Sequence, residues 1–129
     1  MNPKESLLKS HSKDGDVLTV IENITSFKRL FFIDVEEAKY RGDHAHYKCT
    51  QYMFSIKGNI ELEVTNSIDS FNFNLIPGKN IVEVPPLWWA KQKYSNDCIL
   101  GVLCDMNYDA DDYIRDWNYY LDVIKDEKN

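Results

Sequence analysis

Long apolar runs are missing from this sequence, and so is the pattern of a signal peptide. No stretch of the 129 residues approaches the roughly 18 consecutive apolar residues that a membrane-spanning helix needs. The first ten residues, MNPKESLLKS, lack the apolar core of a secretory signal. We therefore expect neither insertion into a membrane nor export.

Basic residues are outnumbered by acidic ones. Lys and Arg total 15 against 21 Asp and Glu, which gives a formal net charge of -6. Nonspecific binding to nucleic acid or to an anionic membrane depends on excess positive charge, so the overall charge argues against both partners. Many of the acidic residues fall in the last third of the chain, and the remainder is closer to balance. A phosphorylated small molecule therefore stays open as a ligand.

Cysteine, glycine and proline are all sparse. The three cysteines, Cys49, Cys98 and Cys104, lack C-x-x-C spacing and lie in apolar surroundings, which favours reduced core thiols over disulfides or zinc ligands. This cysteine usage predicts a cytoplasmic protein. With 5 Gly, 4 Pro and 43% hydrophobic residues the composition is that of a globular chain, and its length predicts a single domain over residues 1–129.

Short segments with strand character follow one another from about Leu18 to Cys104, separated by turn residues, which predicts an all-β sandwich or barrel. Apolar and polar residues alternate most clearly at 60–64 and 71–75. Gly58 is expected in a tight hairpin turn between strands at 52–56 and 60–64. After Tyr108 the pattern changes.

The last part of the chain predicts one amphipathic helix. Apolar residues from Tyr113 to Ile124 recur at helical spacing, and Asp109 or Asp111 is expected to cap the helix. The chain is therefore expected to be a β fold closed by a single carboxyl-terminal helix.

Two of the three histidines, His44 and His46, lie two residues apart in a segment expected to form a strand. This spacing points both side chains to one face, so they can converge inside a barrel. Imidazole titrates near neutral pH and can both accept and return a proton, which makes the pair a candidate for acid–base catalysis. The alternative is a pair of hydrogen-bonded core histidines without a catalytic role.

The histidine segment resembles the first motif of the cupin proteins, but the set of metal ligands is incomplete. Cupins follow H-x-H with a glutamate, where this chain has Gln51, and a second motif supplies another histidine, where this chain has Ala90. A divalent ion normally takes several ligands that include a carboxylate or a third imidazole. We therefore expect neither a metal nor any other cofactor.

Cations near the histidines are candidates for binding a phosphorylated substrate. Arg41 and Lys48 flank the histidine pair, and Arg29 precedes it in the chain. Guanidinium and ammonium groups give oxyanions charge-assisted hydrogen bonds, although each of these residues is equally consistent with ordinary surface charge. Gln51 and Trp89 complete the predicted binding set, the tryptophan as a flat surface for a sugar or a base.

Four segments carry a resemblance to a known family, and the RGDHAH and YDADDYIRD segments together are specific. They are residues 28–33 (KRLFFI), 41–46 (RGDHAH), 84–86 (VPP) with Trp89, and 108–116 (YDADDYIRD). In these motifs the chain resembles the sugar 3,4-ketoisomerases, WxcM-like cupins that act on dTDP-4-keto-6-deoxyglucose. The resemblance implies a dimeric double-stranded β-helix that moves the sugar carbonyl from C4 to C3 without a metal, for deoxyamino sugars of surface glycans. It also implies that His46 removes the C3 proton while His44 handles the hydroxyl and carbonyl protons.

The sequence departs from the family pattern at two places. A tyrosine usually follows the K-R pair, where this chain has Phe31 and Phe32, and Ala90 replaces a polar residue that often faces the active site. Two other functions therefore stay open. One is a non-catalytic cupin that binds sugar nucleotides, and the other is a cupin epimerase that inverts a carbon beside the ketone.

Overall fold

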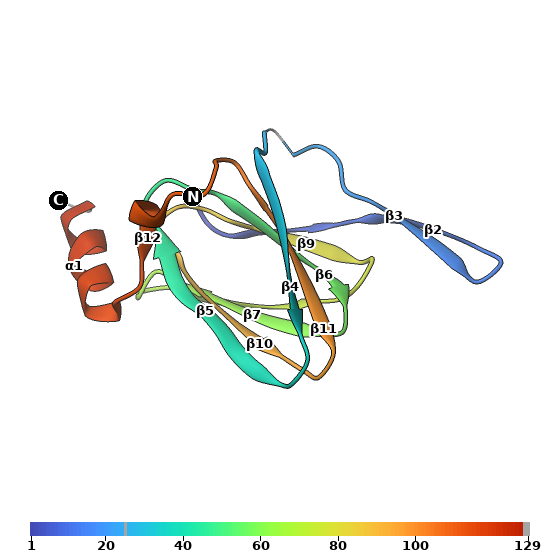
Figure 1. Ribbon diagram of the computed structural model, residues 1–129. Coiled ribbons are helices and arrows are strands. Elements are labelled where there is room, and N and C mark those ends of the chain that lie inside the picture. Colours follow the sequence, from blue (N-terminus) through green and yellow to red (C-terminus); the bar gives the residue numbers. More distant parts are fainter. Residues whose placement is uncertain (25, 128–129) are drawn as a thin grey trace.

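The computed structural model describes residues 1–24 and 26–127 and is built around two antiparallel five-stranded sheets (Figure 1). The first sheet, in the order β1-β9-β6-β11-β4, contains β1 (Lys4–Leu7), β9 (Asn80–Val84), β6 (Gln51–Lys57), β11 (Cys98–Cys104) and β4 (Arg29–Val35). The second sheet, in the order β12-β5-β10-β7-β8, contains β12 (Tyr113–Ile114), β5 (Lys39–His46), β10 (Trp89–Tyr94), β7 (Ile60–Thr65) and β8 (Ser70–Leu75). With the helix α1 (Trp117–Glu127), these sheets confirm the predicted all-β class with one carboxyl-terminal helix.

Strand alternation places the main core between the sheets. In β7, Ile60, Leu62 and Val64 are at most 1% exposed, whereas the two glutamates between them are exposed. Strand β11 (CILGVLC) is buried along most of its length, as predicted for a strand covered on both faces. The three cysteines are buried free thiols, which confirms their prediction as reduced core residues.

The turn at Gly58 joins different sheets. Its φ of 77° is the left-handed conformation that glycine adopts readily, and a Cβ there would lie 2.7 Å from Sγ of Cys98. The predicted hairpin is nevertheless wrong, because β6 pairs with β9 and β11 whereas β7 pairs with β8 and β10. The turn at Gly78 makes a similar crossing, from β8 to β9. The strands on either side of each of these two turns thus belong to opposite walls of the fold.

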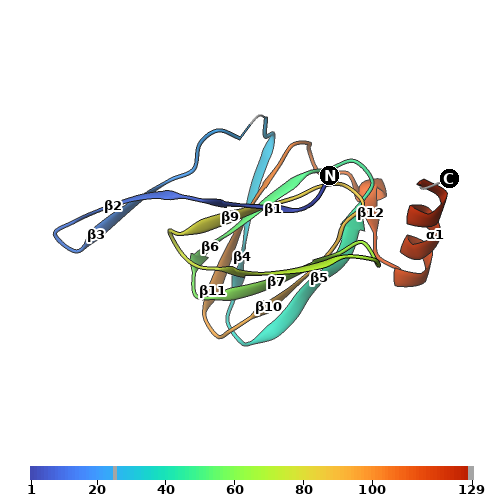
Figure 2. The same ribbon diagram turned by 180° about the vertical axis from the view of Figure 1, so that it is seen from behind.

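Strand character was predicted only from about Leu18, inside the third strand, so the first two amino-terminal strands were missed. The residues of the three amino-terminal strands are mostly polar and almost all exposed. Strand β1 pairs with β9 at the edge of the first sheet. Strands β2 (Lys9–Lys13) and β3 (Asp16–Val20) pair with each other and extend away from the two sheets as a separate arm (Figures 1 and 2). We call residues 9–20 the amino-terminal arm.

The carboxyl-terminal helix begins later than predicted. The segment Tyr113–Ile114 is strand β12 rather than the first turn of the helix, and it pairs with the end of β5. Asp109 caps only a short 3-10 turn at Ala110–Asp112. The residue that caps α1 is Asp116, whose Oδ1 accepts hydrogen bonds from the backbone N–H groups of the second and third helical residues.

Helix α1 covers one end of the second sheet (Figure 2). It packs Tyr120 and Ile124 against Ala45, Trp89 and Ile114, which together form a second, smaller core. The hydroxyl of Tyr120 donates to the carbonyl oxygen of Leu87, 2.7 Å away. Among the described residues, no helix is both long and apolar enough to cross a membrane.

Candidate active site

A cavity of about 220 Å³ lies between the two sheets. Strands β4, β6 and β11 contribute one side of its lining and β5 and β10 the other, with two residues from the segment at β12. The lining residues are Arg29, Phe31, Ile33, Arg41, Gly42, His44, Gln51, Met53, Gln92, Leu100, Val102, Tyr113 and Arg115. Apolar side chains thus share the lining with arginines, glutamines, a histidine and a tyrosine, which suits a polar small molecule.

Strand β5 brings the two predicted catalytic histidines together. The ring centroids of His44 and His46 are 5.0 Å apart, and the ring planes are nearly perpendicular at 77°. Tyr113 is the register partner of His46, and its ring lies 5.1 Å from the ring of His44 and 4.4 Å from that of His46. The spacing of two residues therefore places both imidazoles in one small volume.

Burial favours the neutral form of both imidazoles. Desolvation, and then the nearby His46, lowers the pKa of His44 from 6.5 to about 4. Desolvation also lowers the pKa of His46, although the hydrogen bond and charge of Asp112 act in the opposite direction. Within the described part of the chain, Nδ1 of His44 and Nε2 of His46 are buried without a hydrogen-bond partner. Neither of these nitrogens is therefore occupied by a hydrogen bond within the described part of the protein.

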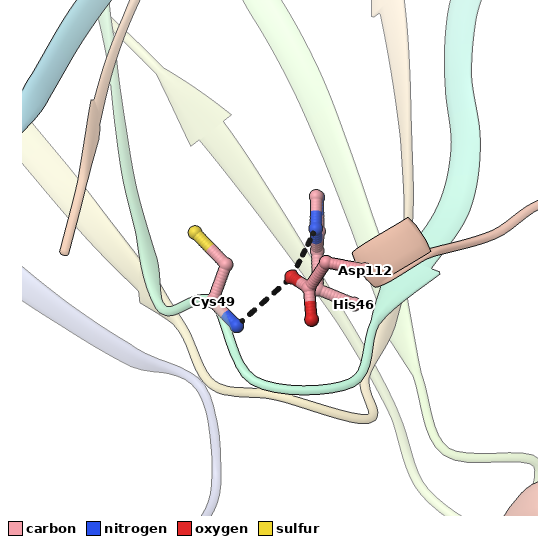
Figure 3. A group of neighbouring side chains, drawn as sticks. All are labelled: His46, Cys49 and Asp112. Carbon is pink, nitrogen blue, oxygen red and sulfur yellow. Dashed lines mark hydrogen bonds and ion pairs between the residues drawn. The ribbon is translucent and has the colours of Figure 1, made fainter. Parts of the chain in front are cut away.

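His46 hydrogen-bonds to Asp112, and the loop that follows β5 binds Asp112 in turn. His46 is only 7% exposed and does not itself line the cavity, but its ring contacts His44 and Tyr113, which do. Its Nδ1 lies 3.1 Å from Oδ2 of Asp112 (Figure 3). The backbone N–H of Cys49 donates to the same oxygen, and that of Lys48 donates to Oδ1.

The side chains of His46, Cys49 and Asp112 are of types that bind zinc, and one ligand atom from each lies within 4.8 Å of the others. Both oxygens of Asp112 already accept N–H groups. Hydrogen bonding with Cys104 and burial raise the pKa of the Cys49 thiol, which opposes the thiolate that a metal needs. The hydrogen bonds to Asp112 and the raised thiol pKa thus weigh against a metal at this trio.

Three predicted substrate-binding residues, Arg29, Arg41 and Gln51, line the cavity. The guanidinium of Arg29 lies 4.6 Å from the centroid of the Phe31 ring, a cation–π contact that orients it at the wall. Arg115 makes the corresponding contact with the Tyr113 ring, at 4.4 Å. Several cationic groups therefore surround one small cavity, an arrangement suited to an anionic ligand.

Two predicted binding residues, Lys48 and Trp89, lie outside this cavity. Lys48 has an exposed side chain, and its backbone contributes the hydrogen bond to Asp112. Trp89 faces the second core, and its Nε1 donates to Oδ1 of Asp43 at 2.9 Å. The reason is strand alternation: Ala90, next to Trp89 on β10, takes the inward position and pairs with His44.

Comparison with known proteins decides the family. The family model described as FdtA, WxcM-like, C-terminal matches residues 2–125. The chain belongs to this family. The TDP-4-oxo-6-deoxy-α-D-glucose 3,4-oxoisomerase of Aneurinibacillus thermoaerophilus is 30% identical over 116 residues, which cover 85% of this chain and 83% of that protein.

Solved structures of sugar 3,4-ketoisomerases share the fold. QdtA from Thermoanaerobacterium thermosaccharolyticum, in complex with TDP, matches with a TM-score of 0.88 at 26% identity, covering 98% of this chain and 96% of that chain. WlaRA, a TDP-fucose 3,4-ketoisomerase from Campylobacter jejuni, matches with a TM-score of 0.83 at 25% identity, covering 95% and 96%. These matches confirm the predicted resemblance to the 3,4-ketoisomerases and the cupin-type fold.

Four residues at or beside the site of this FdtA-family chain were not assigned to it from the sequence: Gln92, Asp112, Tyr113 and Arg115. Three of them belong to the YDADDYIRD motif, which supported the resemblance to the family and the prediction of a helix but was not used to place site residues. Had this segment been predicted as a strand, Tyr113 and Arg115 would have been placed on one face of it. Gln92 lies two residues after Ala90 on β10, and its side-chain amide lies against Gly42, where a Cβ would be 2.7 Å from Oε1.

The departure from the family tyrosine concerns Phe31. Its ring lines the cavity, whereas Phe32 points outward and is 64% exposed. At the position of Phe31 the cavity wall therefore offers an apolar ring without a hydroxyl. Tyr113, on the opposite side of the fold, brings a phenol to the histidine pair.

Proposed function

We propose that this protein is a sugar 3,4-ketoisomerase that moves the carbonyl of TDP-4-keto-6-deoxyglucose from C4 to C3 by acid–base catalysis at His44 and His46, without a metal. The observation that carries the proposal is the pair of adjoining imidazoles, each with a buried unpartnered nitrogen, at a cavity between the sheets. Membership of the FdtA family supports it, since a matched relative is named for this reaction.

The reaction needs only proton transfers. A base removes the proton from C3 while the C4 carbonyl oxygen gains one, which gives an enediol with a C3–C4 double bond. The C3 hydroxyl then loses its proton as C4 gains one, and the carbonyl stands at C3 with no net change in protons or electrons. We assign removal of the C3 proton to His46 and transfer at the oxygens to His44, since neutral imidazoles both accept and return protons.

Substrate binding is assigned to Arg29, Arg41 and Gln51, which line the cavity. The two guanidinium groups provide charge-assisted hydrogen bonds for the diphosphate of a nucleotide sugar. The relative QdtA was solved with TDP bound, which is consistent with a diphosphate ligand at this fold. A role for Lys48 and Trp89 stays a prediction, which this cavity does not support.

Incubation with TDP-4-keto-6-deoxyglucose in D₂O, followed by NMR of the products, tests the proposal. We expect a 3-keto product that carries deuterium at C4. His46→Asn keeps an N–H donor toward Asp112 but has no basic nitrogen, so turnover is expected to fall roughly a hundredfold or more with TDP affinity nearly unchanged.

Two results would point to the other functions. A product that keeps its carbonyl at C4 with an inverted neighbouring carbon would identify an epimerase. Saturable binding of the sugar nucleotide with no deuterium incorporated would identify a binding protein. In both cases the isomerase assignment would be rejected.

We also propose that the protein works in the cytoplasm. Three buried free thiols suit a reducing compartment.

The 3-keto product of the proposed reaction has the carbonyl that an aminotransferase needs to build a deoxyamino sugar. This product fits a role of the protein in the assembly of surface glycans.

The first sheet supports a further part of the proposal, that the active form is a homodimer. On β4, Leu30 and Phe32 alternate with residues that line the cavity, so they point outward, and they are 50% and 64% exposed. Ile56, at the end of β6, which is separated from β4 by β11 in that sheet, is 45% exposed, and the ring of Phe54 lies against Gly101 of β11. An apolar outer face of this kind favours a covering partner, and a second copy of the chain supplies one.

A further inference from the structure

Asp112 lies at the centre of a closed set of hydrogen bonds. Its Oδ1 accepts from the backbone N–H of Lys48 at 2.8 Å, and its Oδ2 accepts from the backbone N–H of Cys49 at 3.2 Å. Its own backbone carbonyl oxygen accepts from the N–H of Tyr47 at 3.0 Å. The loop after β5 therefore wraps around this carboxylate and fixes its position.

The remaining partner of the carboxylate is Nδ1 of His46, 3.1 Å from Oδ2. The side chains of His46 and Asp112 are only 8% and 4% exposed, so water does not compete for this contact. A carboxylate that already receives two backbone N–H groups acts as an acceptor, so the proton of the neutral imidazole belongs on Nδ1. The lone pair is then left on Nε2, the buried nitrogen without a partner.

We propose that Asp112 is a positioning residue that holds His46 as the Nδ1–H tautomer, so that Nε2 is the basic nitrogen in the reaction. This inference rests on the proposed function for its catalytic consequence, while the link between the two side chains stands on geometry alone. Asp112 acts through His46 and does not itself line the cavity.

Other charged groups near His46 set the electrostatic background. Asp112, on the 3-10 turn, favours the protonated imidazole, whereas Arg115 beyond β12 and Arg29 on β4 oppose it. His44 on the same strand, Tyr113 on β12 and the thiol of Cys49 in the loop after β5 also lie close to the ring. Of these, only Asp112 hydrogen-bonds to the imidazole, so it is the group that selects the tautomer.

The direct test is the tautomer of His46, observed by long-range ¹H–¹⁵N NMR of histidine-labelled protein without any ligand. The signals of His46 are assigned by their loss in His46→Asn. We expect a protonated Nδ1 and an unprotonated Nε2 in the wild type, and a shift toward the Nε2–H form in Asp112→Asn, whose amide N–H₂ replaces an acceptor by a donor. A wild-type protein with Nε2–H at His46 would overturn the proposal whether or not the variant folds.

Kinetics provide the second readout. Asp112→Asn is expected to lower kcat by about 10²- to 10⁴-fold with KM changed by no more than a few-fold, the range for an aspartate that orients a catalytic histidine. The acid limb of the pH–rate profile should move to lower pH, because a contact that raises the pKa of His46 is lost. Asp112→Glu retains the carboxylate and is expected to keep the Nδ1–H tautomer and to recover part of the turnover.

The matched control is Asp105→Asn. Asp105 also accepts a backbone N–H, that of Thr50 at 2.9 Å near the end of the same loop, but it makes no hydrogen bond to either histidine. This variant should keep the wild-type tautomer and kcat. Equal losses in both variants, or an unchanged tautomer and kcat in Asp112→Asn, would reject the positioning role. The expected tautomers in a protein without isomerase activity would leave the link to His46 standing and reject the proposed function instead.

Discussion

The partly buried imidazole of His44 couples the stability of the protein to pH. Its pKa is about 4 in the folded chain against 6.5 for an ordinary histidine, chiefly because burial disfavours the charged form. Between these values the unfolded chain binds a proton that the folded chain does not. The stability that this residue contributes is therefore present above pH 6.5 and is lost as the pH falls toward 4. The lowered pKa of His46 acts in the same direction.

We expect His44→Asn to weaken this pH dependence. The free energy of unfolding, measured by urea titration at pH 7, 6 and 5, should fall less steeply with pH in the variant than in the wild type, because one buried titrating group is gone. The control is His11→Asn on the exposed amino-terminal arm, which should keep the wild-type slope. Equal slopes in all three proteins would contradict the prediction.

At this scale the sequence was informative for His44 and His46, because residues two apart on a strand share a face whatever the rest of the fold does. It was less informative for Asp112. The hydrogen bond from His46 spans 66 residues of sequence and depends on where the loop after β5 and the turn before β12 meet in space. Nothing local in either segment encodes that meeting.

At the scale of elements, the start of α1 depends on Asp116. Its carboxylate accepts the N–H groups of Asn118 and Tyr119 at 2.9 and 3.1 Å and so satisfies two donors that the helix leaves open. Asp116→Ala is expected to reduce the free energy of unfolding by about 1 kcal/mol, the usual cost of losing a cap. Urea unfolding provides the measurement.

Asp122→Ala is the control for this prediction, since Asp122 is an exposed acidic residue inside the same helix. It removes one negative charge without removing a cap and should change stability by less than about 0.5 kcal/mol. Similar effects of the two substitutions would show that Asp116 acts through charge alone.

The helix and its start show how much of an element can be predicted from local sequence patterns. Apolar residues from Tyr120 to Ile124 do lie in a helix, but the same periodicity extends back through Tyr113–Ile114, which pairing with β5 turns into a strand. The strands on either side of Gly58 were likewise located correctly from alternation. Their partners were not, because a turn gives the direction change and tertiary packing decides which sheet receives each strand.

At the scale of the whole molecule, the two faces of the first sheet differ, because one lines the cavity and the other exposes apolar side chains. Its inner face supplies cavity residues such as Phe31 and Ile33, and its outer face carries Leu30 and Phe32, which alternate with them along β4. A sheet face in contact with water is usually polar. The outer face is therefore the part of the molecule where assembly would bury apolar surface, on the wall opposite the histidine strand β5.

Phe32→Arg is expected to convert a homodimer into a monomer, because it places a charge at the most exposed apolar position of β4. Size-exclusion chromatography with light scattering measures the mass of each form, and circular dichroism checks that the fold is kept. The control is Ile68→Arg, in the loop between β7 and β8, which is 72% exposed and lies away from this face. That variant should remain a dimer. A monomeric wild type, or a Phe32→Arg variant that still dimerises, would show that this face is not the interface.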